Sequence, residues 1–220
     1  AWAPDGKEIA FIRYVQKPNM MDESYLMTRS MPEGTERMRL AVNYRGQLPG
    51  PGLTYSRDGK WILTSVGSGF YDGSSPRRLV AVSRETAEVV DLFPAPEGMV
   101  GDWNPVLSPR GDRLAFCRCR SATACELLEV RMEGLKAVGE PRVVLAEGAP
   151  DLRAAYLRDG SLVYPKGPPH ARVLWRLGED WLGRETRTQL SPAGEDVTQP
   201  STAVVGGEDR LVYLRNRMDS

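Results

Sequence analysis

Residues that could do chemistry are few and scattered in this chain. The 220 residues include one histidine, His170, and three cysteines, Cys117, Cys119 and Cys125. Hydrolysis by a nucleophile needs a base, usually histidine, within reach of a serine or cysteine, whereas His170 follows two prolines in a loop-like stretch. The glycine-rich turn at 67–69 lacks the strand-to-helix context of a nucleophile elbow, and no phosphate-binding or dinucleotide-binding motif occurs. We therefore expect no catalytic residue and no cofactor.

The cysteines leave three interpretations open. Cys119 and Cys125 flank residues 120–124, an expected loop between two strands, so they could face each other across a hairpin and form a disulfide. All three could instead be free thiols. A thiolate metal site would lack a fourth ligand and any nearby histidine, and we expect no metal. A disulfide would be compatible with an oxidising compartment.

Acidic residues recur directly before glycine, at Asp5, Asp58 and Asp159. In tight turns, aspartate side chains commonly accept hydrogen bonds from the backbone N–H groups of the turn. We therefore interpret these carboxylates as caps of turns and not as catalytic groups.

The elements that would position these residues are expected to be strands, because one short stretch recurs. Copies occupy residues 3–11, 55–64, 107–116 and 156–164, and a degraded copy lies at 204–213. Each copy has a tight turn, mostly Asp-Gly, followed by a run of β-forming residues, which indicates a hairpin. Two further strand-like stretches follow each of the first four copies. A period of about 50 residues is typical of a propeller or a solenoid.

Several of these runs are apolar at consecutive positions, as in Ile9-Ala10-Phe11-Ile12. A strand with one face in water would alternate, so we expect these strands to be covered on both faces. Propeller blades cover each other in this way, and the tight hairpins disfavour a parallel solenoid. The sequence therefore predicts an all-β fold, a β-propeller of four-stranded antiparallel blades in one domain spanning residues 1–220. The expected blades lie near residues 1–45, 53–93, 104–146 and 153–191, with a partial fifth blade at 200–215.

The repeat also carries a family resemblance. Ala3-Pro4-Asp5-Gly6-Lys7, followed by Ile9-Ala10-Phe11, resembles the repeats of TolB-type, WD-like β-propellers, and the likeness extends over nearly the whole chain. It departs from the pattern at Arg110, where aspartate is usual, and at Gly206-Gly207, where Pro-Asp is missing. A narrower resemblance is to propellers at the C-terminal end of bacterial winged-helix transcriptional regulators or Ser/Thr protein kinases. Its segments are residues 79–86, 139–142 and 173–176.

Charge argues against direct binding of nucleic acid. Lys plus Arg and Asp plus Glu are 29 each, so no net charge attracts nucleic acid or an anionic membrane. We interpret short basic clusters such as Arg77-Arg78 and Arg118-Cys119-Arg120 as solvated edges. No apolar run approaches the ~20 residues that cross a bilayer, and we expect no membrane insertion by this chain. For the compartment, the periplasmic part of a membrane-anchored bacterial protein is our first expectation and the cytoplasm our second.

Binding residues are expected on the face that gathers the long loops. Connections from second to third strands and from blade to blade should emerge there, and loops on rigid scaffolds commonly carry binding residues. Phe70 and Tyr71 stand in a Gly- and Ser-rich loop, Asp102 and Trp103 come just before an expected innermost strand, and His170 lies in another loop of that face. These residues are the candidate binding site.

The leading hypothesis is a non-catalytic interaction or sensing module that binds a protein, a peptide or a small ligand. The resemblance also implies two alternatives: an accessory propeller that gates a prolyl-oligopeptidase-like serine peptidase, and a TolB-like envelope scaffold. Four blades and a half would leave unpaired edges at open ends. We therefore expect the chain to be a fragment of a larger propeller, or to associate with a second copy.

Overall fold

The fold consists of β-strands joined by turns. The structure is a computed structural model, and it describes residues 1–15, 23–42, 52–67, 76–94, 97–121, 123–148 and 152–216. No helix occurs in these ranges, and hence none that could cross a membrane. The chain divides into two compact units, one of Ala1–Leu107 with Gly111–Pro150, the other of Ser108–Arg110 with Asp151–Ser220.

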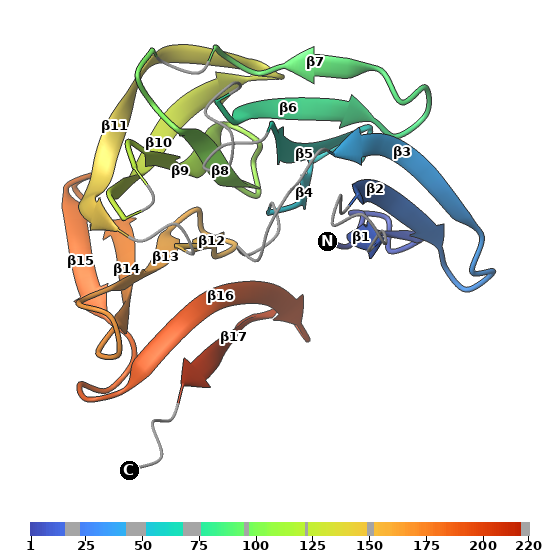
Figure 1. The fold of residues 1–220 in the computed structure, drawn as a ribbon. Helices are drawn as coiled ribbons and strands as arrows, with labels where there is room; N and C mark the ends of the chain where they lie inside the picture. Colours follow the sequence, from blue (N-terminus) through green and yellow to red (C-terminus); the bar gives the residue numbers. More distant parts are fainter. Residues whose placement is uncertain are drawn as a thin grey trace. The chain divides into compact units, whose positions relative to one another are not determined.

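The first unit contains three antiparallel sheets, each formed by consecutive strands (Figure 1). The first sheet has β1 (Glu8–Val15), β2 (Glu23–Ser30) and β3 (Glu36–Val42). The second has β4 (Thr54–Tyr55), β5 (Trp61–Val66), β6 (Arg78–Ser83) and β7 (Val89–Asp91). The third has β8 (Gly101–Leu107), β9 (Arg113–Cys119), β10 (Cys125–Glu133) and β11 (Lys136–Gly148).

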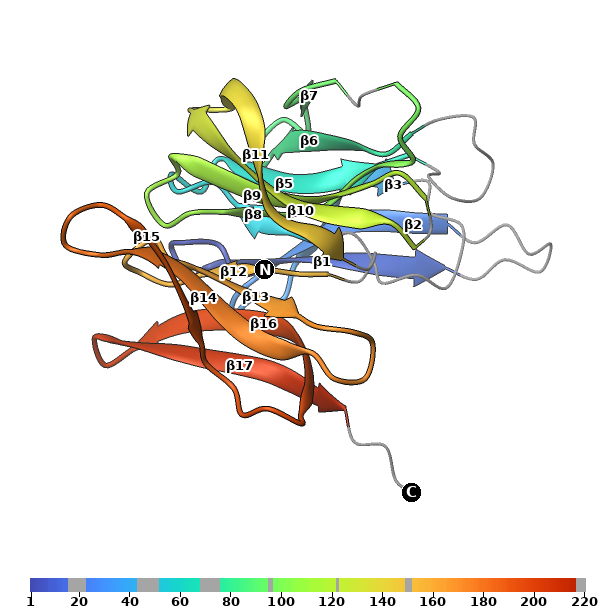
Figure 2. The same ribbon diagram turned by 90° about the vertical axis from the view of Figure 1, so that its left-hand side faces the viewer.

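The second unit contains two antiparallel sheets. One is four-stranded, with β12 (Ala155–Tyr156), β13 (Leu162–Lys166), β14 (Val173–Glu179) and β15 (Glu185–Gln189). The other is a hairpin of β16 (Asp196–Val205) and β17 (Glu208–Asn216), which run side by side in Figure 2.

The predicted strand pattern is largely confirmed, with corrections at the ends of the sheets. The two further strand-like stretches expected after each of the first four copies all overlap observed strands. The first sheet has three strands where four were expected, because its innermost strand is reduced to a bridge between Trp2 and Ile9. The third sheet starts at Gly101 and the last hairpin at Asp196, each a few residues before the expected start.

In the first unit, the second sheet is covered on both faces, as the consecutive apolar residues predicted. Along β5, Ile62 belongs to an apolar cluster with residues of the first sheet, such as Leu26. The next residue, Leu63, belongs to a cluster with residues of the third sheet, such as Phe116. Because successive side chains of a strand point to opposite faces, each strand supplies two cores, and both Ile62 and Leu63 are fully buried.

Two strands carry a backbone feature that the sequence interpretation missed. Asn104, before Pro105 in β8, has a φ of 52°, and Gln199, before Pro200 in β16, has a φ of 51°. The pairing register shifts at both places, which marks a β-bulge. Proline has no N–H to give to a ladder, so a bulge is where a strand can accept it. In β8 the Asn104 side chain accepts a hydrogen bond from the N–H of Gly52 at 3.1 Å.

Candidate functional site

A pocket of about 750 Å³ opens in the first unit, where turns of the first and second sheets meet. It lies at the end where β1 and β5 begin, since Glu8 and Trp61, their first residues, both line it. The remaining wall comes from the turns between β2 and β3, between β4 and β5 and between β6 and β7, and from residues of β2, β3 and β6 beside them. The lining residues are Glu8, Ser30, Glu33, Thr35, Arg37, Arg39, Asp58, Gly59, Lys60, Trp61, Ser83, Arg84, Glu85, Thr86 and Glu88.

Glu8 is the buried acidic group of this pocket. Its carboxylate accepts a hydrogen bond from the Tyr55 hydroxyl at 3.0 Å and pairs with the Arg84 Nε at 2.9 Å. Arg39 places a guanidinium nitrogen 3.5 Å from the same carboxylate, and its Nε donates to the Thr28 hydroxyl at 3.0 Å. A buried carboxylate is costly unless paired and hydrogen-bonded, and here both conditions are met. Glu8, Arg39, Arg84 and Tyr55 are called the pocket floor below.

Two groups at the pocket floor and beside it, Tyr55 and Asp5, have shifted pKa values. Burial, together with the hydrogen bond to the Glu8 carboxylate, raises the pKa of Tyr55 well above its usual value. The Lys7 N–H, and then the Arg84 guanidinium, lower the pKa of Asp5, which pairs with Arg84 at 2.9 Å. The tyrosine therefore stays neutral and the aspartate ionised.

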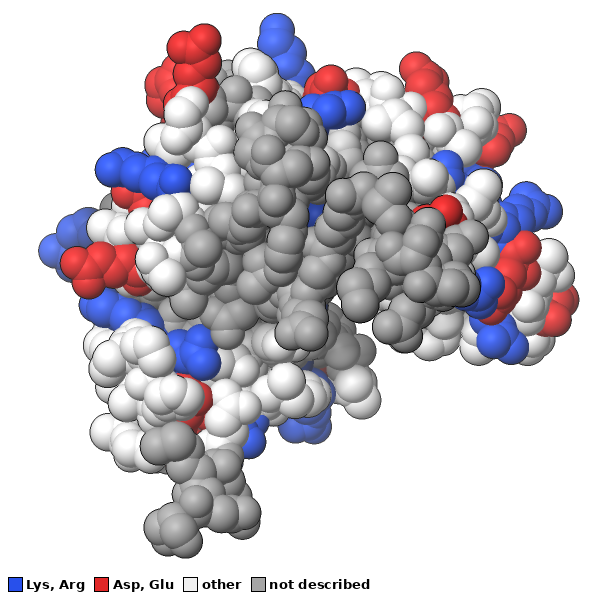
Figure 3. Space-filling view, viewed as in Figure 1, with Lys and Arg blue, Asp and Glu red and all other residues white. Residues whose placement is uncertain are grey.

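The rim of the pocket carries charges of both signs. Arg37 and Lys60 are exposed, as are Glu85 and Glu88, and Trp61 is half-buried among them. The face drawn in Figure 3 shows the same character over the described residues, with basic and acidic side chains interspersed. The pocket is therefore suited to a ligand that itself carries both charges.

Asp102 and Trp103 lie within β8 instead of ahead of it, and both are buried. Arg118 on β9 donates two hydrogen bonds to the Asp102 carboxylate, at 2.8 and 2.9 Å. Burial nevertheless raises the pKa of Asp102. The Arg77 guanidinium lies 5.7 Å from the Trp103 ring centroid and is itself buried, so Arg77 and Arg118 are not the solvated edge that was expected.

The remaining predicted site residues fall elsewhere. His170 is exposed in the turn between β13 and β14, with a φ of 68°, in the second unit. Phe70 and Tyr71 lie outside the described residues. The structure thus brings Asp102 and Trp103 together in one strand and places His170 in the other unit. The binding role of these residues stays a prediction.

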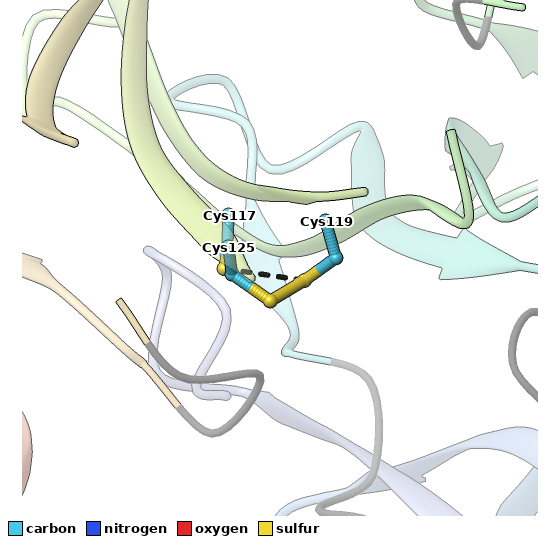
Figure 4. A group of neighbouring side chains, drawn as sticks. All are labelled: Cys117, Cys119 and Cys125. Carbon is cyan, nitrogen blue, oxygen red and sulfur yellow. Dashed lines mark hydrogen bonds between the residues drawn. A yellow bond between two sulfur atoms is a disulfide. The ribbon is translucent and has the colours of Figure 1, made fainter. Parts of the chain in front are cut away.

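The cysteines form one buried group on β9 and β10. Cys119 and Cys125 are joined by a disulfide, which selects one of the three interpretations left open by the sequence (Figure 4). Cys117 keeps its thiol, and its Sγ lies 3.9 Å from that of Cys119.

The turn aspartates behave as expected. The carboxylates of Asp5, Asp58 and Asp159 accept hydrogen bonds from the N–H groups of Lys7, Lys60 and Ser161, at 2.9, 3.1 and 2.8 Å. The prediction that they cap turns is confirmed.

Comparison with known proteins supports the fold. No protein-family model matches the chain, and no curated protein matches it in sequence. Similar solved structures include TolB from Acinetobacter baumannii, with 13% identity and a TM-score of 0.60 over 96% of this chain and 50% of that one. Oligogalacturonate lyase from Vibrio parahaemolyticus has 16% identity and a TM-score of 0.58, over 98% and 58%. Prolyl oligopeptidase B from Galerina marginata has 13% identity and a TM-score of 0.60, over 98% and 31%.

These likenesses define the class of fold. The described residues are all-β, built of antiparallel sheets of up to four strands, and their fold is that of a partial β-propeller similar to TolB. It spans at most about three-fifths of the length of the three proteins named above. At these identities the comparison concerns architecture, and function must come from the site itself.

Proposed function

We propose that the chain is a non-catalytic β-propeller binding module, and that its ligand is a peptide or protein segment held in the pocket of the first unit. The observation that carries the proposal is the pocket floor, where Glu8 is held by Arg39, Arg84 and Tyr55. Such a floor is ordered before any ligand arrives, so binding costs little side-chain entropy.

A mixed-charge ligand fits the pocket better than a polyanion does. Its lining has four basic side chains, those of Arg37, Arg39, Lys60 and Arg84, and these are accompanied by five acidic ones. A partner with charges of both signs can pair with this lining. A partner of a single sign would meet like charges, which weakens binding. A segment of polypeptide supplies both charges, and the exposed part of Trp61 offers an apolar contact beside them.

The setting of the module is a separate part of the proposal. We favour the C-terminal sensory part of a bacterial regulator, on the resemblance of segments 79–86, 139–142 and 173–176. The alternatives are an accessory propeller of a prolyl-oligopeptidase-like peptidase and a TolB-like envelope scaffold. A prolyl oligopeptidase and a TolB protein are both among the solved structures that are similar in fold to this chain. The coding sequence around this chain discriminates them: a winged helix or kinase supports the first, a hydrolase domain the second, and a secretory signal the third.

The binding proposal is tested with a phage-displayed library of random peptides. We expect the chain to enrich peptides of mixed charge, and their affinity to fall at least tenfold in the variant Arg37→Glu/Lys60→Glu. The matched control is Arg131→Glu/Lys136→Glu, which reverses two exposed charges on the β10–β11 hairpin of the same unit. Absence of enrichment, or equal loss in both variants, would contradict the pocket.

The loop-face prediction is tested in the same assay. Phe70→Ala/Tyr71→Ala should leave the affinity of the enriched peptides unchanged if the pocket is the site. A loss confined to this variant would assign binding to the loop face, and the pocket proposal would be wrong.

A further inference from the structure

The side chains of the three cysteines form a sulfur cluster that has no part in the proposed peptide binding. Their Sγ atoms all lie within 4.8 Å of one another (Figure 4). All three side chains are at most 1% exposed. The chain has no other cysteine, so its entire thiol chemistry is confined to this cluster.

The strand register explains why the sulfurs meet. Cys117 and Cys119 are two residues apart on β9, and side chains at such spacing lie on the same face of a strand. Cys125 on β10 stands directly opposite Cys119 in the antiparallel pairing. The cluster is therefore held by the backbone of two central strands, whatever the oxidation state of the sulfurs.

The spacing suits a three-coordinate ion. A metal with metal–sulfur bonds of about 2.3 Å, at the centre of three sulfurs, keeps them about 4 Å apart. The distance of 3.9 Å between the Cys117 and Cys119 sulfurs already has this value. The Cys119–Cys125 disulfide would have to open, while the Cys117 Sγ already lies within 4.8 Å of both other sulfurs.

The number and type of the ligands, three cysteine sulfurs, indicate which kind of metal ion would bind. Zinc sites are almost always tetrahedral and need a fourth ligand, whereas the metal-ligating group found among the described residues consists of the three buried cysteines alone. Soft thiolate ligands favour Cu(I). Over the part of the chain that the structure describes, the site therefore offers three sulfurs, which fits a soft monovalent ion.

We propose that Cys117, Cys119 and Cys125, once reduced, form a three-thiolate site for Cu(I), and that the Cys119–Cys125 disulfide closes this site. A cellular dithiol supplies the two electrons: its sulfurs become a disulfide, and Cys119 and Cys125 each gain a hydrogen. Cu(I) then forms three copper–sulfur bonds, and the three thiol protons pass to solvent. Copper keeps its oxidation state in this second step.

The test uses the whole chain, with Cu(I) as the probe and bicinchoninate as the competing chelator under nitrogen. One sample is reduced with dithiothreitol and then freed of it, and another keeps the disulfide. We expect the reduced chain to take one Cu(I) with sulfur neighbours only, three of them by X-ray absorption. The oxidised chain, which serves as the matched control, should bind at least a hundredfold more weakly.

Cys117→Ala separates a three-sulfur site from a simple pair of thiols. This variant keeps the disulfide partners, and its far-ultraviolet circular dichroism in the oxidised form checks that it folds. After reduction we expect at least a tenfold loss of Cu(I) affinity and two sulfur neighbours in place of three. Undiminished affinity in Cys117→Ala, nitrogen or oxygen neighbours in the wild type, or failure of the reduced wild type to take one equivalent would each overturn the proposal.

Discussion

At the scale of single residues, the sequence predicted contacts between residues that are close along the chain, and it did not predict contacts between distant ones. The turn aspartates were assigned correctly because each contacts a backbone N–H two residues away. The pocket floor was missed because Glu8, Arg39 and Arg84 come from different hairpins and meet only in the folded sheets. A charged residue at position 8, where the second copy of the repeat has Trp61, was the one available signal.

Asp58 gives a pH-dependent prediction at this scale. The Ser56 hydroxyl, and also the Lys60 N–H, lower the pKa of Asp58 in the folded state. Its ionised form therefore stabilises the fold fully above the unfolded-state pKa, and this contribution is lost as the pH falls through the folded-state pKa. Because Asp58 is exposed and solvent screens its charge, we expect Asp58→Ala to lower the free energy of unfolding by less than about 1 kcal/mol at pH 7, and the difference from wild type to shrink towards pH 3.

Urea denaturation at the two pH values measures this effect. Asp58→Asn is the matched control, because it keeps an oxygen that can accept from Lys60 while removing the titrating group. It should lose less stability than the alanine variant and show little change with pH. An Asp58→Ala effect that persists undiminished in acid would show that the carboxylate charge is not involved.

At the scale of elements, strands and turns followed from the sequence, while their irregularities did not. Turns of the Asp-Gly kind and apolar runs are local signals, and the β-forming runs that they marked in the first four repeats overlap observed strands. The bulge at Asn104 depends on a partner strand and on Gly52, whose missing side chain is required: a Cβ there would lie 2.7 Å from the Asn104 Cα. The dipeptides Asn104-Pro105 and Gln199-Pro200 were a readable hint, because proline inside a strand suggests a bulge.

The two-sided burial of β5 predicts similar costs on both faces of one strand. Ile62→Ala and Leu63→Ala should each lower the free energy of unfolding by about 3 kcal/mol, because each leaves a cavity in a different apolar cluster. The measurement is urea denaturation followed by tryptophan fluorescence.

Val212→Ala on β17 is the control for this pair, since its side chain is 67% exposed. It should change stability by less than about 0.5 kcal/mol. A marginal cost at Ile62 with a full cost at Leu63 would mean that β5 is packed on one face only.

At the scale of the whole molecule, the period of the repeat predicted a propeller but gave no sign of two compact units. All copies follow the same spacing, so nothing in the pattern separates the first unit from the second. The prediction of a single domain stays untested, as does the number of blades in the complete protein.

The last hairpin carries the prediction of self-association. Within the described residues, β17 pairs only with β16, and Val212 and Leu214 expose more than half of their side chains. An edge strand with exposed apolar side chains favours association. We expect the mass measured by analytical ultracentrifugation to rise with concentration, and Val212→Lys/Leu214→Lys to suppress this rise.

Trp181→Lys is the comparison for this experiment, because Trp181 is 88% exposed but lies in the turn between β14 and β15. It should leave the association unchanged. Equal suppression by this variant would assign the association to general surface hydrophobicity, and a monomer at all concentrations would contradict the prediction.

The proline bulges of β8 and β16 have a consequence for how the repeats find their proper neighbours. Hairpins as alike as those at residues 3–11 and 55–64 can exchange partners during folding, a common failure of repetitive chains. If β8 slid by one residue in one direction, Pro105 would take the left-handed position of Asn104, which the proline ring forbids by holding φ near −65°. If it slid in the other direction, bulky Trp103 would have to adopt that conformation. Because β16 has a bulge of the same kind in the second unit, each unit contains a strand that resists a shift of its pairing register. The bulges thus favour the correct strand register in a chain whose repeats have similar sequences.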